Sequence, residues 1–227
     1  MVQTSNEGFN SPRFHITLGG LKTGFPFAIY KCNKVSKRNT MIKVIDNFVN
    51  PAYYEAIEDC LLYKCPWFWT PSITDGELKD EAAAVFGFSH RIFNGKQESQ
   101  FYHFLLPMFL QAKEEINAEA FLRARADMTV IAREQVTYEP HIDIPKTYGH
   151  INMIFYIGSS DGDTIIYKEK FLAKEPYIEP KLPKTLTEEQ RVTPKANRVV
   201  IFSGEHWHTG QSPKEHSRRV LINSNFI

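Results

Sequence analysis

The stretch EPHIDIPKTYGH, from Glu139 to His150, sets the expected architecture and chemistry of this chain. Within it stands the triplet His141-Ile142-Asp143. At the end of a strand, residues two apart point to the same face, so the imidazole and the carboxylate would enter one space while Ile142 faces away. One more imidazole would complete the two-histidine, one-carboxylate triad that holds non-haem iron. A triplet this short also arises by chance, so the prediction depends on the rest of the chain.

Outward from this stretch, the second half of the chain has the patterning of short strands. Apolar and polar residues alternate from Phe121 to Ile144, and INMIFYIG, directly after the triplet, predicts a buried strand. Further strands are expected at TIIYK, NRVVIF and RRVLINSNFI, with a hairpin turn at Asp161-Gly162. Residues 171–195 are expected to form an irregular, Pro-rich insertion, and SGEHWHTGQSPKEHS a long turn.

Two helices are expected before these strands. Residues 51–63 follow the strand MIKVIDNFV and begin after Asn50-Pro51. Residues 99–117 form the longest amphipathic pattern, in which Pro107 is expected to cause a kink or a break. Helices followed by a series of short strands predict an α+β chain whose second half closes as a jelly-roll or barrel.

Length and composition are those of an ordinary globular protein. The 227 residues carry a formal net charge of +1, which favours neither nucleic acid nor an acidic membrane surface as a partner. The sequence lacks a signal-peptide layout and an apolar run of membrane-spanning length, so a cytoplasmic protein is expected. The expected division is an N-terminal extension of uncertain structure at 1–40, a domain at 41–227, and a metal-binding barrel at 121–227. The three cysteines are expected to be free thiols: Cys32, Cys60 and Cys65.

The third metal ligand should come from a later strand that meets the first one in space. His206 and His208 flank Trp207 and are two apart, so alternation alone does not choose between them. The last strand then carries Arg218 and Arg219, with Asn223 four residues beyond the second arginine. The planar fork of an arginine binds a carboxylate bidentately, which suits a small diacid held deep in a barrel.

In this order, the motifs resemble those of a known family. HIDIP, FYIGSSDGDTIIY, VTPKANRVVIFSGEHWHTGQSP and SRRVLINSNF are similar to segments of the Fe(II)/2-oxoglutarate-dependent oxygenases, specifically the prolyl 4-hydroxylase-like group with its small phage-encoded members. The resemblance covers the chain from about Glu134 to Phe226. It implies a double-stranded β-helix, a cupin-like form of the jelly-roll, with supporting N-terminal helices. The chain lacks the Trp or Gly-Gly that often stands before the strand at Asp161-Gly162.

The resemblance also implies which residues hold the metal and the co-substrate. Because the family's distal histidine precedes a small residue and then Gly or Ser, His208 is selected over His206, and the expected iron ligands are His141, Asp143 and His208. The expected 2-oxoglutarate-binding residues are Arg219 rather than Arg218, Tyr156 and Asn223. Tyr138, three residues before His141, is either a pocket residue or a core tyrosine.

The activity that the resemblance implies is that of a dioxygenase using Fe(II), 2-oxoglutarate and O2. It would hydroxylate a C–H bond, with a peptidyl prolyl residue as one substrate class, and decarboxylate 2-oxoglutarate to succinate. A non-catalytic or 2-oxoglutarate-independent cupin-like metal protein is the alternative. The loop with Trp67 and Trp69 and the segment Phe171–Lys195 would line the substrate cleft, and Arg198 would anchor a turn. The other histidines are expected at the surface or in the core: His15, His90, His103, His150 and His216.

Overall fold

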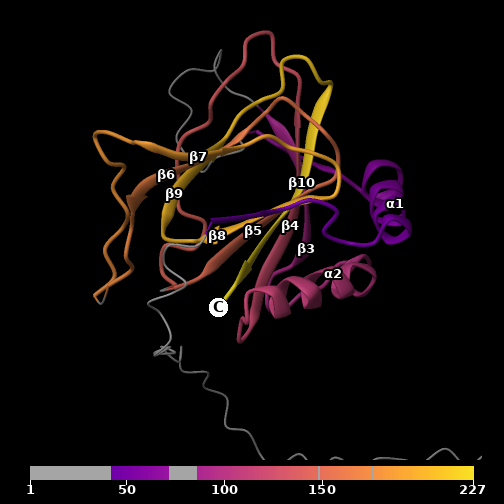
Figure 1. Cartoon of the computed structure of the whole chain (residues 1–227), viewed down its shortest axis with the longest axis horizontal. Helices are drawn as coiled ribbons and strands as arrows, with labels where there is room; N and C mark the ends of the chain where they lie inside the picture. Colours follow the sequence, from indigo (N-terminus) through magenta and orange to yellow (C-terminus); the bar gives the residue numbers. More distant parts are fainter. Residues whose placement is uncertain (1–41, 72–85, 148, 175) are drawn as a thin grey trace, which may run out of the picture. The chain divides into compact units, whose positions relative to one another are not determined.

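The computed structural model describes residues 42–71, 86–147, 149–174 and 176–227 (Figure 1). Its elements in chain order are β1 (Ile42–Ile45), α1 (Pro51–Asp59), the π-helical turn η2 (Cys60–Lys64), β2 (Phe68–Thr70), β3 (Gly87–Phe93), α2 (Tyr102–Glu115), β4 (Phe121–Val130), β5 (Ile151–Tyr156), β6 (Thr164–Lys170), β7 (Glu188–Val192), β8 (Arg198–Ser203), β9 (His206–Gly210) and β10 (Arg218–Phe226). The division into an extension at 1–40 and a domain at 41–227 stays a prediction, since residues 1–41 lie outside the described part.

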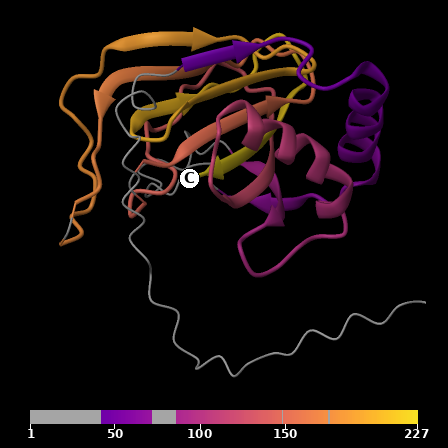
Figure 2. The ribbon, with the colours of Figure 1, turned by 60° about the horizontal axis from the view of Figure 1, so that its bottom comes forward.

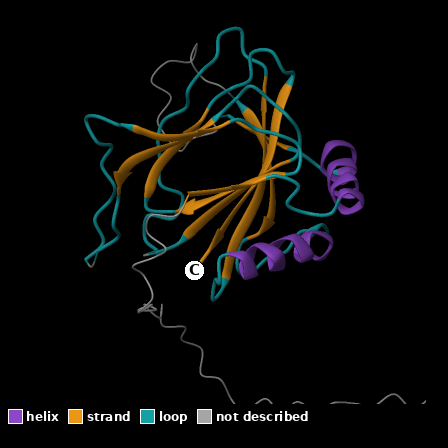
Figure 3. Ribbon diagram, viewed as in Figure 1, coloured by secondary structure: helices purple, strands orange, loops and turns teal. Residues whose placement is uncertain are grey.

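The strands form two antiparallel sheets. The large sheet has the order β1-β8-β5-β10-β4-β3-β2, and the small sheet has the order β7-β6-β9. Strand β10, the last in the chain, lies between β4 and β5 at the centre of the large sheet. Figures 2 and 3 show both helices on the same side of the large sheet. The arrangement is therefore one layer of helices and two of strands, in agreement with the predicted α+β class.

Each face of the large sheet buries its own apolar cluster. One cluster joins the helices to the sheet and contains, for example, Leu105 and Met108 of α2 with Phe155 and Ile222 of the strands. The other cluster lies between the sheets, where Ile154 and Leu221 of the large sheet share one group with Ile166 of β6. Side chains two apart on a strand share a face, so Arg219, Leu221 and Asn223 of β10 face the small sheet.

The helices follow the sequence signals closely. The Asn50 side chain accepts a hydrogen bond from the Tyr53 amide at 2.9 Å, and Pro51 occupies the first turn of α1. The expected helix at 51–63 consists of α1 followed directly by η2. The buried residues of α2 recur at the predicted amphipathic spacing: Leu105, Met108, Phe109 and Ala112. The helix continues through Pro107 and does not break there. The prolyl residue is exposed, on the side away from the core.

Three strand predictions need correction. The alternating pattern predicted β structure from Phe121 to Ile144, but β4 ends at Val130, and between Val130 and Ile144 the chain makes only isolated bridges, at Thr137 and His141. The insertion at 171–195 contains β7, whose mostly exposed residues lack an apolar face because the strand lies at a sheet edge. The stretch predicted as a long turn contains β9, buried from His206 to Thr209 and paired with β6. The polar sequence of this stretch lacks the apolar alternation of a strand, and β9 forms because it pairs with β6 and is buried there.

No helix of the described residues is long and apolar enough to cross a membrane. Cys60 and Cys65 are free thiols as predicted, while Cys32 lies outside the described residues.

Candidate metal centre

The side chains of His141, Asp143 and His208 converge at one point, and one ligand atom from each lies within 4.8 Å of the others. His141 Nε2 is 3.8 Å from Asp143 Oδ1, and His208 Nε2 is 3.7 Å from Asp143 Oδ2. The convergence comes from a backbone bridge, in which the His141 amide donates to the His208 carbonyl at 2.9 Å and the reverse bond is 3.2 Å. This bridge joins the loop before β5 to strand β9 of the small sheet.

Backbone carbonyls orient both imidazoles. His141 Nδ1 lies 3.2 Å from the Glu139 carbonyl oxygen, and His208 Nδ1 lies 3.1 Å from that of His206. A carbonyl oxygen only accepts, so each Nδ1 carries a proton and each ring turns its Nε2 toward Asp143. Two nitrogen lone pairs and a carboxylate facing one space are the donor set of a divalent transition metal.

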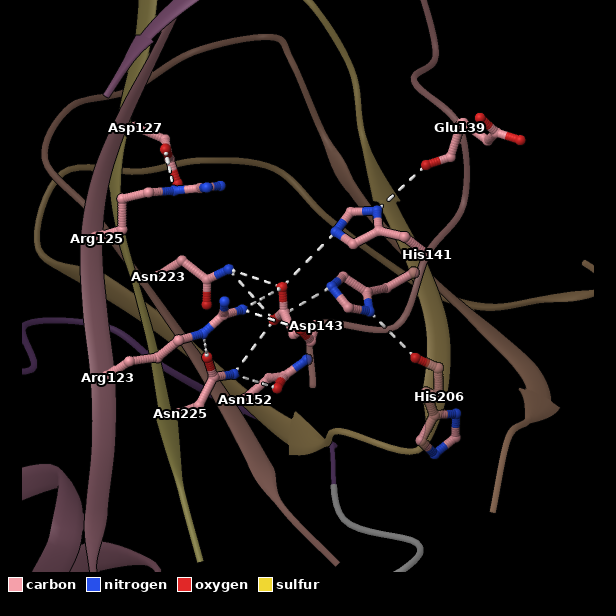
Figure 4. Close-up of polar contacts among 11 residues, drawn as sticks. Arg123, Arg125, Asp127, Glu139, His141, Asp143, Asn152, His206, Asn223 and Asn225 are labelled. Carbon is pink, nitrogen blue, oxygen red and sulfur yellow. Dashed lines mark hydrogen bonds and ion pairs between the residues drawn. The ribbon is translucent and has the colours of Figure 1, made fainter. Parts of the chain in front are cut away.

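A polar network holds the Asp143 carboxylate from the side opposite the imidazoles (Figure 4). The Asn223 amide donates to both carboxylate oxygens at 3.2 Å, and the Asn225 amide donates to Oδ2 at 3.3 Å. The Arg123 guanidinium lies 3.3 Å from Oδ1 and donates to Asn225 Oδ1 at 2.6 Å. The Asn225 amide also donates to Asn152 at 2.6 Å. The large sheet therefore sets the orientation of this carboxylate.

The electrostatics place these groups in the forms that bind metal. Burial by itself raises the pKa of Asp143, but the charges of His208, His141 and Arg123 outweigh it and hold the pKa well below the usual range. Burial, and then the charge of His141, lowers the pKa of His208 to about 4. At neutral pH the carboxyl is ionised and the His208 imidazole is neutral, as metal ligation requires.

A cavity extends from the two imidazoles to the buried guanidinium of Arg219. Arg219 is only 6% exposed, and its Nη2 donates to the Thr164 hydroxyl at 2.7 Å, while its Nε has no hydrogen-bond partner among the described residues. Two glycines make room for it: a Cβ at Gly210 would lie 3.3 Å from Nη1, and one at Gly162 would lie 3.0 Å from Cδ. By contrast, Arg218 is exposed.

Tyr156 and Asn223 were both expected beside Arg219. Tyr156 lies near Arg219, and Asn223 lies near Asp143. The Tyr156 hydroxyl is fully buried and donates to the Thr164 hydroxyl at 2.7 Å. Asn223 contacts Asp143 at the other end of the cavity, because four residues of β10 separate it from Arg219 by about 13 Å of strand. A 2-oxoglutarate-binding role for either residue stays a prediction.

Thr164 and Tyr138 line the cavity and offer hydrogen-bond donors. The sequence analysis did not single out Thr164, and it left open whether Tyr138 lies in the pocket or in the core. Thr164 Oγ1 accepts from both Tyr156 and Arg219, so its own proton remains available to an acceptor in the cavity. The Tyr138 hydroxyl is buried and makes no hydrogen bond within the described part of the chain. Burial raises the pKa of Tyr138, which keeps the hydroxyl a donor.

The other buried histidines make local hydrogen bonds to backbone carbonyls. His206 points away from Asp143 (Figure 4), and its Nδ1 donates to the Tyr167 carbonyl at 2.6 Å. His150 is buried with its Nδ1 donating to the Thr147 carbonyl at 2.9 Å, and His90 is buried with its Nδ1 donating to the Pro66 carbonyl at 2.9 Å. His103 and His216 are exposed, and His15 lies outside the described residues. The structure thus brings His208, not His206, to Asp143.

Two segments were predicted to line the substrate cleft: the loop with Trp67 and Trp69, and the segment Phe171–Lys195. Trp67 packs against the helix-side cluster and donates to the Leu61 carbonyl at 3.1 Å, so it belongs to the core, whereas Trp69 is 63% exposed. Within the segment 171–195, the Tyr177 ring lies 4.9 Å from the Lys146 ammonium, three residues after Asp143. Arg198, predicted to anchor a turn, holds the segment before β8: its Nη1 donates to the Thr193 carbonyl at 2.9 Å and its Nε to Asp46 at 2.6 Å.

Comparison with protein-family models finds no match for this chain, and neither does comparison with curated proteins. Solved structures match over most of its length. An oxidoreductase of the 2OG-Fe(II) oxygenase family from Burkholderia pseudomallei has a TM-score of 0.57 and 12% identity, covering 82% of this chain and 84% of that one. The epimerase SnoN of nogalamycin biosynthesis, in complex with Fe3+ and alpha ketoglutarate, has a TM-score of 0.54 and 10% identity, covering 86% and 82%.

A prolyl hydroxylase from Trichoplax adhaerens, in complex with a hypoxia inducible factor peptide, has a TM-score of 0.52 and 10% identity, covering 82% of this chain and 83% of that one. The chain has the fold of the 2OG-Fe(II) oxygenases. The predicted double-stranded β-helix with supporting helices is therefore confirmed, and the similarity to phage-encoded members stays a prediction.

In this oxygenase fold, the residues present fit both an iron ion and 2-oxoglutarate. The imidazoles and carboxylate of the cluster leave their free lone pairs facing one space. The buried guanidinium with an unpartnered Nε, cradled by Gly162 and Gly210, is the kind of group that receives a carboxylate. The binding of 2-oxoglutarate by Arg219 stays a prediction.

Proposed function

We propose that this protein is an Fe(II)- and 2-oxoglutarate-dependent dioxygenase that hydroxylates a C–H bond. One observation carries the proposal: the cavity is lined by the two imidazoles of the His-Asp-His cluster and by a buried arginine. A structural module, or a protein that binds only a metal, has no use for a buried cation across a cavity from three metal-binding side chains.

In this proposal, His141, Asp143 and His208 hold Fe(II), and Arg219 holds the distal carboxylate of 2-oxoglutarate. The Thr164 hydroxyl, whose oxygen already accepts two hydrogen bonds, donates to the same carboxylate. Tyr138 supplies a further donor to the bound co-substrate. The apolar side chains of Ile154 and Leu221 line the middle of the cavity and exclude water.

When bound, Fe(II) with 2-oxoglutarate and O2 supplies the oxidising chemistry, in which 2-oxoglutarate becomes succinate and CO2 and one oxygen atom enters the C–H bond. The chain's own residues provide position and charge. Asn223 and Asn225 keep the Asp143 carboxylate turned toward the imidazoles, and the backbone carbonyls that accept from each Nδ1 keep both Nε2 atoms turned toward that carboxylate.

Hydroxylation and a peptidyl prolyl substrate are the finer parts of the proposal, and the sequence resemblance supports them. Among the proteins of this fold, the one from Trichoplax adhaerens is a prolyl hydroxylase and SnoN is an epimerase. The same fold thus serves more than one oxidative outcome, so the reaction product must be identified directly.

The test is anaerobic titration of the Fe(II)-loaded protein with 2-oxoglutarate, followed by the weak visible charge-transfer absorption of the chelate. The absorption is expected in the wild type and in His206→Ala, and is expected to be lost in His208→Ala. His206 is the matched control because it is a buried histidine of the same strand that points away from Asp143. Fe(II) binding without the absorption would instead support a cupin-like protein that does not use 2-oxoglutarate.

A further inference from the structure

One arginine of the large sheet contacts a candidate metal ligand directly. Arg123 of β4 lies on the side of the Asp143 carboxylate away from the imidazoles, with its Nη2 3.3 Å from the carboxylate oxygen Oδ1 (Figure 4). The same Nη2 donates to the backbone carbonyl of Asp143 at 3.2 Å. A cation of the protein and a metal ion would therefore share this one carboxylate.

Neutral groups hold the Arg123 guanidinium in place independently of the carboxylate. Its Nε donates to Asn225 Oδ1 at 2.6 Å, in addition to the bond from Nη2 to the Asp143 carbonyl. Asn225 is fully buried, and its amide donates at 2.6 Å to Asn152, which is fully buried as well. Because these bonds do not depend on the charge of the carboxylate, we expect the guanidinium to keep its place when the carboxylate binds a metal.

The charge of Arg123 is balanced differently from that of Arg125, which lies two residues further on the same face of β4. Arg125 pairs with Asp127 of its own strand at 2.7 Å. Among the described residues, the carboxylate within ion-pair distance of Arg123 is that of Asp143 alone. The counter-charge of Arg123 is thus the candidate metal ligand itself.

This pairing lowers the attraction of the cluster for positive ions. Imidazoles bind a metal as neutral ligands, so Asp143 supplies the negative charge of the ligand set, and Arg123 cancels it. The electrostatic energy of an ion beside this pair is proportional to the charge of the ion. The guanidinium therefore disfavours a trivalent ion more than a divalent one.

We propose that Arg123 is a positioning residue of the metal centre whose charge, acting through Asp143, favours Fe(II) over Fe(III). The proposal rests on the metal centre of the proposed function and adds control of its redox balance. The proposed activity uses Fe(II), so iron that has been oxidised to Fe(III) cannot support it. Asn223 and Asn225 already orient the carboxylate with neutral amides, and orientation alone does not require a cation at this position.

The test is a redox titration of the iron-loaded protein without 2-oxoglutarate, in which the EPR signal of Fe(III) reports the oxidised fraction at each potential. Wild type is compared with Arg123→Gln, which removes the charge and keeps an amide donor, and with Arg123→Lys, which keeps the charge. The Mn(II) affinity of each protein is measured by direct titration. Asn225→Ala is the matched control for orientation, because it removes a donor to the same carboxylate without changing the charge.

In Arg123→Gln, the ratio of Fe(III) affinity to Fe(II) affinity is expected to rise on the order of tenfold, which lowers the potential by about 59 mV. The same variant should bind Mn(II) at least as tightly as the wild type, because a repelling charge is gone. Arg123→Lys should keep the wild-type potential.

Three results would overturn the proposal: an unchanged potential in Arg123→Gln, a potential in Arg123→Lys shifted as far as in Arg123→Gln, or Mn(II) binding in Arg123→Gln that is weakened or lost as in Asn225→Ala. In each case the arginine would act by orientation and not by charge. The charge-transfer titration with 2-oxoglutarate separates these failures from a failure of the proposed function, because the redox titration uses no 2-oxoglutarate.

Discussion

Replacing Arg219 by methionine is expected to weaken 2-oxoglutarate binding while leaving the ligand-free protein at least as stable as the wild type. Arg219 is 6% exposed, and no described carboxylate lies within ion-pair distance of it. A buried cation without a counter-ion costs several kcal/mol. Its compensating contacts are the bond to Thr164 and the Tyr156 ring, 5.9 Å away, together worth about 2 to 4 kcal/mol.

Because the two contributions nearly cancel, the Arg219→Met protein is expected to gain about 1 to 3 kcal/mol or to remain unchanged in the free energy of unfolding. Methionine is apolar, unbranched and shorter, so it fits the space between Gly162 and Gly210. For the co-substrate, loss of a buried bidentate pair with a carboxylate corresponds to about 3 to 4 kcal/mol, or two to three orders of magnitude in Kd.

The assay is denaturant unfolding with and without 2-oxoglutarate in the presence of Mn(II). A ligand present at 100 times its Kd stabilises the wild type by about 2.7 kcal/mol, and the same concentration should leave Arg219→Met unaffected. Arg218→Met is the control, with changes within about 0.5 kcal/mol and normal stabilisation by 2-oxoglutarate. A variant destabilised by more than about 2 kcal/mol, yet still stabilised by 2-oxoglutarate, would make Arg219 a structural residue and refute the assigned pocket.

Three smaller perturbations test the surroundings of the site. A Cβ at Gly204 would lie 2.1 Å from the His150 ring, so Gly204→Ala is expected to lower the free energy of unfolding by about 2 kcal/mol, and an unchanged denaturation midpoint would contradict this packing. Asn225→Ala removes an amide donor from Asp143 and should weaken Mn(II) binding about tenfold in a direct titration; equal affinity would show that the donor does not orient the carboxylate. The hydrogen bond from a β8 arginine lowers the pKa of Asp46 to about 2, so the folded state binds fewer protons than the unfolded state between about pH 4 and pH 2 and loses stability as the pH falls through that range. Asp46→Asn should remove this loss, which is about 1 kcal/mol or less because the pair is partly exposed; a wild-type pH slope in the variant would exclude the carboxyl as its source.

Local sequence signals predicted the helices and most of the strands. The Asn50 cap, the buried face of α2 and the apolar run of β5 each depend on residues close together in the chain. The same alternation that predicted β4 also puts Arg123, Arg125 and Asp127 on one face of that strand. Their proximity to a metal centre could not be inferred, because it depends on the pairing of β4 with β10.

In the candidate site, too, the sequence predicted some features and the tertiary structure decided others. The sequence by itself predicted that His141 and Asp143 enter one space, and its motif order indicated the oxygenase fold and favoured His208 and Arg219. Tertiary structure decided which imidazole reaches Asp143. His206 and His208 are both buried, so burial does not distinguish them, but only His208 pairs with His141 in a backbone bridge. It also decided that Asn223 contacts Asp143, and that Thr164 joins the small sheet to Arg219. The physical reason is that these contacts join strands far apart in the sequence, whose register depends on burial of the whole sheet and not on any local pattern.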